Sequence, residues 1–122
     1  MATPLPQGDD LLLLHNPRCS KSRATLALLE EAGVPFATRL YLEEPLSADE
    51  LAEVGRRLGR GARDWVRTKE AAWSGAGLAG DASDEDVYAA VAKAPVLMER
   101  PVVLRGERAV IGRPPENARD LL

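Results

Sequence analysis

The sequence predicts an α/β protein with a mixed four-stranded sheet, in the order β-α-β, three helical segments and then β-β-α. Three observations predict this class: a short apolar run, Leu11–Leu14, leads into a helical pattern; a helix-capping motif begins at Ser47; and two β-branched runs lie near the C-terminus. With 122 residues, we expect a flexible tail at 1–10 and a single domain at 11–122, with a helical insertion at about 47–94.

The first part of the chain alternates strand and helix signals. Leu11–Leu14 is wholly apolar and is followed by a His-Asn-Pro turn at 15–17, which is typical of a buried strand running into a loop. From Ser22 the apolar residues recur at helical spacing until the Gly-Val-Pro stop signal at 33–35. Phe36–Leu42 is then predicted as the second strand, parallel to the first because a helix connects them.

The middle of the chain carries helix signals only. Ser47 and Glu50 form a capping box, in which each side chain can satisfy a backbone amide of the other residue. Ala62–Val66 indicates a further short helical turn. Ser83 begins another helix, which Pro95 ends.

The end of the chain returns to strands. Val102–Leu104 and Ala109–Ile111 are short β-branched runs on either side of Arg105–Arg108, and together they predict an antiparallel hairpin. Pro114-Pro115-Glu116 then begins a last helix, with proline at its start and a carboxylate in its first turn.

Composition excludes several classes of protein. One cysteine rules out an internal disulfide and a multi-thiolate metal cluster, so we expect no bound metal. The net charge of −3 favours neither nucleic-acid binding nor a basic arm. The longest apolar run has six residues, too few to span a membrane, and residues 1–10 lack the basic start of a signal peptide. We expect a cytoplasmic protein, and a monomer because no apolar surface stripe is left unassigned.

Cys19 lies in the stretch with the densest chemistry, between a predicted strand end and a predicted helix start. Unpaired amides at a helix start favour a thiolate over a thiol. Arg23, with the neighbouring Arg18 and Lys21, adds positive charge, and Ser22 can donate a hydroxyl hydrogen bond to the sulfur. The polar, cationic loop therefore favours a reactive thiol over a buried structural cysteine.

The role of His15 stays open on the residues alone. It can support the thiolate, by lowering the pKa of the thiol or by moving a proton, or it can simply be a hydrogen-bonded residue that ends its strand. A Cys–His hydrolase is disfavoured, because His15 is only four residues from Cys19 and no third orienting group is evident.

Three segments resemble the glutaredoxin-coupled arsenate reductase family, and the likeness extends in order from about residue 11 to 122. It implies a thioredoxin-like fold with a helical insertion, in agreement with the order of elements above. The segments that carry it are His15–Arg23, Leu97–Val103 and Ile111–Glu116, supported by Tyr41–Glu43 and Val66–Lys69.

The resemblance also implies a chemistry. The Cys19 thiolate would attack the arsenic of arsenate, or act on a similar oxyanion, while Arg67, Arg100 and Arg113 hold the oxyanion through charge-assisted bonds. No cofactor would be bound; glutathione would be the cosubstrate and glutaredoxin the protein partner. Pro101 matches the proline that follows a cis peptide bond in thioredoxin-like folds.

Two other functions remain as alternatives. Cys19 and Ser22 form a Cys-x-x-Ser pattern, which is typical of a monothiol glutaredoxin-like oxidoreductase, although the three arginines argue against that function. Some relatives of the family are redox regulators that bind RNA polymerase. Those generally use a Cys-x-x-Cys pair, and Ser22 occupies its second position here.

Overall fold

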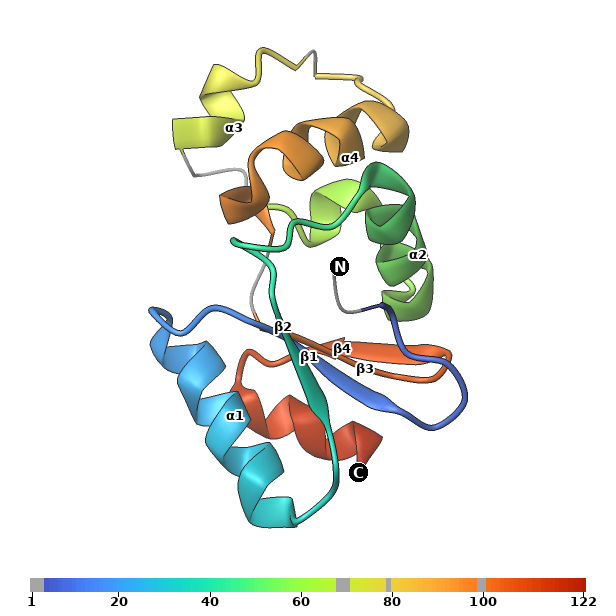
Figure 1. Cartoon of the computed structure of the whole chain (residues 1–122). Coiled ribbons are helices and arrows are strands. Elements are labelled where there is room, and N and C mark those ends of the chain that lie inside the picture. Colours follow the sequence, from blue (N-terminus) through green and yellow to red (C-terminus); the bar gives the residue numbers. More distant parts are fainter. Residues whose placement is uncertain (1–3, 68–70, 79, 99–100) are drawn as a thin grey trace. The chain divides into compact units, whose positions relative to one another are not determined.

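The computed structural model describes residues 4–67, 71–78, 80–98 and 101–122. The chain divides into two compact units, drawn in Figure 1. The first unit combines Met1–Glu44 with Arg100–Leu122, and the second spans Pro45–Glu99.

A mixed four-stranded sheet forms the centre of the first unit, as predicted. The strand order is β2-β1-β3-β4. β1 and β2 are parallel, with Leu12 opposite Ala37, whereas β3 is antiparallel to both β1 and β4. The strands are β1 (Leu11–His15), β2 (Ala37–Leu40), β3 (Val102–Arg105) and β4 (Arg108–Ile111).

Two helices pack on one face of this sheet: α1 (Ser20–Ala32) and the 3₁₀ helix η3 (Pro115–Leu121), which lie side by side in Figure 1. Because side chains alternate along a strand, the other face receives the alternate residues of β1 and β3, and these are buried too. Burial on both faces explains why β1 is a continuous apolar run. The core between sheet and helices contains Leu11, Leu13, Leu29, Val103, Ala118 and Leu121.

The second strand is shorter than the predicted range 36–42: it begins at Ala37 instead of Phe36 and ends at Leu40, because a turn replaces the last two predicted residues. The amide nitrogens of Glu43 and Glu44 both donate to the carbonyl of Leu40, at 2.9 and 2.8 Å. Arg39 is only 1% exposed, and its guanidinium donates from Nε to the carbonyl of Glu44 at 2.9 Å. These bonds turn the chain at 41–44, so Tyr41 and Leu42 leave the sheet.

Two helices also differ from the prediction. α1 begins at Ser20 rather than Ser22, because Cys19 takes the N-cap position and its carbonyl accepts the amide hydrogen of Arg23 at 3.0 Å. The last helix begins where expected but is a 3₁₀ helix, in which hydrogen bonds close over three residues instead of four.

The second unit is helical, and α2 packs against α4. The predicted capping box is confirmed: the Ser47 amide donates to Glu50 Oε1 and the Glu50 amide to Ser47 Oγ, both at 3.1 Å. No helix in the described ranges is long and apolar enough to cross a bilayer. The elements are α2 (Ala48–Leu58), η1 (Ala62–Asp64), α3 (Ala71–Gly75), α4 (Asp84–Lys93) and η2 (Pro95–Leu97), with an isolated bridge between Val66 and Met98.

A glycine allows α2 to approach the aromatic pair Trp65 and Tyr88. Trp65 Nε1 donates to the Tyr88 hydroxyl at 3.2 Å, and the two ring centroids are 5.9 Å apart. A Cβ atom on Gly55 would overlap the Tyr88 hydroxyl, so this helix position needs a residue without a side chain.

We therefore predict that Gly55→Ala destabilises the protein by about 1–2 kcal/mol, because overpacking and a strained Trp65–Tyr88 hydrogen bond outweigh the better helix propensity of alanine. Gly75→Ala is the matched control, since no atom lies within 4 Å of the Cβ it would add. Urea unfolding of both variants measures the difference. Equal free energies of unfolding for Gly55→Ala and the control would contradict the packing argument.

Candidate functional site

Cys19 lies in a tight connection between the end of β1 and the start of α1. Its amide nitrogen donates to the carbonyl of Asn16 at 3.0 Å, and the Arg18 amide donates to Asn16 Oδ1 at 3.0 Å. These bonds place Cys19 at the N-cap of α1, with 8% of its surface exposed. At this position a side chain faces the unpaired amides and the positive end of the helix, which favour a thiolate.

Ser22 connects the end of β1, the loop and the helix. Its side chain is fully buried, and its Oγ lies 2.7 Å from His15 Nδ1 while accepting the amide hydrogen of Asn16 at 3.0 Å. A hydroxyl carries one hydrogen. Ser22 can direct that hydrogen to His15 Nδ1 when the ring carries its proton on Nε2, or toward a different acceptor when Nδ1 itself carries the proton.

His15 is the last residue of β1 and is only 6% exposed. Burial lowers its pKa below 6.5, and the positive charge of Arg23 lowers that pKa further. The ring is therefore favoured in its neutral form, in which it can exchange a hydrogen bond with Ser22. The positive charge of the loop comes instead from its arginine and lysine side chains.

Those cations are exposed. Arg23 is fixed by a hydrogen bond from Nη1 to the carbonyl of Pro17 at 2.9 Å, and Arg18 and Lys21 also lie at the surface. The sequence contains no acidic residue between Leu11 and Leu29. The first turn of α1 accordingly has no carboxylate, whereas α2 and α4 each have at least two. The thiol is thus placed in a locally cationic part of an acidic chain.

The segment that contains Arg113 packs against α1. The Gly112 amide donates to the carbonyl of Pro101 at 2.8 Å. A Cβ atom on Gly112 would lie 2.7 Å from Thr25 Oγ1 and 2.8 Å from Pro101 Cγ, so only glycine fits. Arg113 itself is exposed, and its carbonyl accepts from Asn117 Nδ2 at 3.3 Å.

The structure therefore places His15, Cys19, Ser22 and Arg23 at the end of β1, in the loop that follows it and in the first turn of α1. The segment that contains Arg113 packs against the same helix. Arg67 belongs to the second unit, where its amide donates to Leu97, and its side chain is half-buried. Arg100 lies outside the described residues, and with it the peptide bond before Pro101 that was expected to be cis. Within the described ranges a cis bond occurs at Arg113–Pro114.

Sequence reasoning missed two positions that shape this site, Thr25 and Gly112. Thr25 is fully buried, and its hydroxyl donates to the carbonyl of Lys21 at 2.9 Å. Ser22, Thr25 and Leu29 repeat at helical spacing and form the buried stripe of α1, a pattern that a search for apolar residues alone does not find. In the described part of the chain, no group of three or more His, Cys, Asp or Glu side chains is arranged so that it could hold a metal ion.

We predict that His15 titrates below pH 6.5 in the folded protein and that Arg23→Gln raises its pKa, because a positive charge that opposes protonation is removed. Since the unfolded chain binds the proton more readily, His15 adds stability above pH 6.5 that is lost as the pH falls through the folded pKa. His15 is the sole histidine of the sequence, so its ring signals in an NMR titration are unambiguous. An unchanged midpoint in Arg23→Gln would contradict this electrostatic coupling; Arg119→Gln is the control.

The chain is similar to known proteins over most of its length. The model of the ArsC family matches residues 14–121. The arsenate reductase of Haemophilus influenzae is 40% identical over 114 residues, covering 92% of this chain and 98% of its own. The uncharacterized protein YfgD of Escherichia coli K12 is 44% identical over 112 residues, covering 90% and 94%.

A solved structure extends the likeness to three dimensions. The arsenate reductase from Vibrio cholerae has a TM-score of 0.89 and 39% sequence identity, covering 95% of this chain and all of its own. The thioredoxin-like fold that the sequence resemblance implied is thereby confirmed. Since the family model spans nearly the whole chain and relatives of about 40% identity cover nine-tenths of it, the chain belongs to the ArsC family.

Proposed function

We propose that this protein reduces arsenate to arsenite, with the Cys19 thiolate as the nucleophile. The observation that carries the proposal is the placement of Cys19 at the N-cap of α1, in a cationic loop of a chain that belongs to the ArsC family. The arsenate reductases of Haemophilus influenzae and Vibrio cholerae support the choice of substrate.

The first step forms a bond between the Cys19 sulfur and arsenic, and one arsenate oxygen leaves as water after protonation. Arsenic stays pentavalent in this adduct. The positive end of α1 and the exposed side chains of Arg18, Lys21 and Arg23 would favour the anionic form of the sulfur and attract the oxyanion. Ser22 can orient the sulfur by directing its hydroxyl hydrogen toward it while His15 carries a proton on Nδ1.

The second step needs a thiol from another molecule. Reduction of As(V) to As(III) takes two electrons, which two thiols supply when they become one disulfide, and this chain has one cysteine. Glutathione would attack the Cys19 sulfur, so that an S–S bond forms, the S–As bond breaks and its electron pair stays on arsenic. A glutaredoxin thiolate would then attack the glutathione sulfur of this mixed disulfide. A disulfide between glutaredoxin and glutathione would form, and the Cys19 thiolate would be released.

Arg67, Arg100 and Arg113 are proposed to hold the oxyanion. A guanidinium offers a planar fork of donors that matches two oxygens of a tetrahedral anion, and its fixed charge offsets the repulsion between thiolate and arsenate. The packing of Gly112 against Thr25 and Pro101 supports this role for Arg113, because it fixes the backbone next to the arginine while the side chain stays exposed.

We predict that Cys19→Ser abolishes arsenite production, because a serine hydroxyl cannot form the S–As bond or the mixed disulfide. The assay measures arsenite with glutathione and each of several glutaredoxins, and a parallel reaction replaces them with thioredoxin and its reductase. If arsenite forms only with thioredoxin and its reductase, the protein reduces arsenate but glutathione and glutaredoxin are not its reductants. Wild-type activity no higher than that of Cys19→Ser with every reductant would reject the reaction itself. If the protein reduces no arsenate but removes glutathione from a mixed disulfide, the glutaredoxin-like alternative is favoured.

We predict further that Arg113→Gln lowers kcat/KM for arsenate by about 10- to 100-fold, because a donor to the oxyanion is lost. Arg113→Lys should recover part of this loss, since it restores the charge but not the fork. Arg119→Gln is the matched control, an exposed arginine in the 3₁₀ helix that follows. Equal values of kcat/KM for Arg113→Gln and Arg119→Gln would show that Arg113 does not bind the oxyanion.

A further inference from the structure

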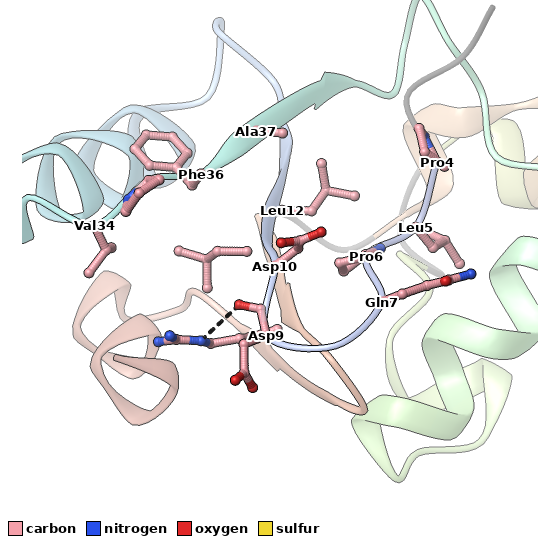
Figure 2. Close-up of a pocket in the computed structure, with 13 residues that line it drawn as sticks. Pro4, Leu5, Pro6, Gln7, Asp9, Asp10, Leu12, Val34, Phe36 and Ala37 are labelled. Carbon is pink, nitrogen blue, oxygen red and sulfur yellow. Dashed lines mark hydrogen bonds between the residues drawn. The ribbon is translucent and has the colours of Figure 1, made fainter.

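The first unit contains a pocket of about 790 Å³ at the opposite end of β1 from the thiol. Leu11 and Leu12, the first residues of β1, lie in its wall, whereas Cys19 follows the last residue of that strand. Figure 2 shows the pocket between the segment Pro4–Asp10 and the connection from α1 to β2. It is therefore separate from the candidate site.

The N-terminal wall of this pocket is attached to the β3–β4 hairpin. Arg105 Nε donates to the carbonyl of Asp9 at 3.2 Å, and the Gly106 amide donates to the carbonyl of Asp10 at 3.4 Å. Gly106 has a φ of 57°, and a Cβ atom there would overlap the carbonyl of Gly8, so the close approach requires glycine. Pro6 is buried. The segment Pro4–Asp10 is therefore held in a defined position against the β3–β4 hairpin.

The pocket has an apolar body and an acidic side. Leu5, Pro6, Leu12, Val34 and Phe36 supply the apolar surface, as Figure 2 shows.

Asp9 and Asp10 add two exposed carboxylates, and neither carboxylate forms a hydrogen bond or ion pair with another described residue. The single cation in the lining, Arg105, is directed to backbone carbonyls, those of Asp9 and Leu121, the latter at 2.8 Å. The two carboxylates outnumber this one guanidinium, so the lining has a net negative charge.

We propose that this pocket binds a small amphipathic cation, an apolar molecule that carries an ammonium group. The volume falls within the range of about 300–1,000 Å³ typical of small-molecule sites. The apolar body would displace water from Leu12, Val34 and Phe36, and the ammonium would pair with Asp10. This inference does not depend on the arsenate chemistry.

The test compares two probes with the same body and opposite charge, 4-phenylbutylamine and 4-phenylbutyrate. Each is titrated into the full chain labelled with ¹⁵N, and backbone amide signals are followed by NMR. The amine should shift the amide signals of Leu12, Phe36 and Ala37 in a saturable way, and the carboxylate should bind about fivefold more weakly or more. Equal midpoints for both probes, shifts elsewhere in the chain, or no saturation would overturn the proposal.

Two variants sharpen this test. Asp10→Asn should weaken amine binding about fivefold, whereas Asp81→Asn, an exposed aspartate of the second unit, should leave it unchanged. Ala37→Phe, at an exposed position of the lining, should fill the pocket and remove binding while the α1 signals stay as in the wild type. If Asp10→Asn binds the amine as well as Asp81→Asn does, the assigned charge pairing is wrong.

Discussion

The buried hydroxyl of Ser22 is the contact on which the geometry of the candidate site depends. It belongs to the first turn of α1, lies 2.7 Å from the ring of the last residue of β1, and accepts the amide hydrogen of Asn16 in the turn between them. Leaving a buried polar group without a partner costs about 1–3 kcal/mol. The strand, the turn and the helix are therefore coupled, and Cys19 is held at the helix end by bonds that do not involve its sulfur.

The elements that depend on local sequence were predicted well. The apolar run of β1, the capping box at Ser47 and the C-terminal hairpin carry their signals within a few residues, and the structure has all three. The predicted end of β2 at Leu42 was wrong. Tyr41 and Leu42 are residue types that suit a strand, but the guanidinium of the buried Arg39 fixes a turn at 41–44. A buried charge that caps a turn has no signature in a pattern of apolar residues.

In the candidate site too, features with a local sequence pattern were predicted, and features that depend on buried polar or long-range contacts were not. The location of Cys19 between strand and helix follows from the local pattern, and so do the nearby cations. The contact between His15 and Ser22 connects two polar side chains that are both buried, whereas polar residues are ordinarily expected at the surface. The close approach of Gly112 to Thr25 joins segments far apart in sequence, so no local motif could predict it.

The pairing of β1 with β3 has a consequence for how the chain folds. Leu12 lies opposite Leu104, about 90 residues later, and the whole second unit intervenes between the two strands. Contacts at such separation form slowly, because a long loop must close before the pairing stabilises it. On the ribosome the second unit, which is continuous in sequence, can assemble first. The sheet is completed only after β3 has been synthesised, so β1, the strand that leads to Cys19, gains its second neighbouring strand late in the life of the nascent chain.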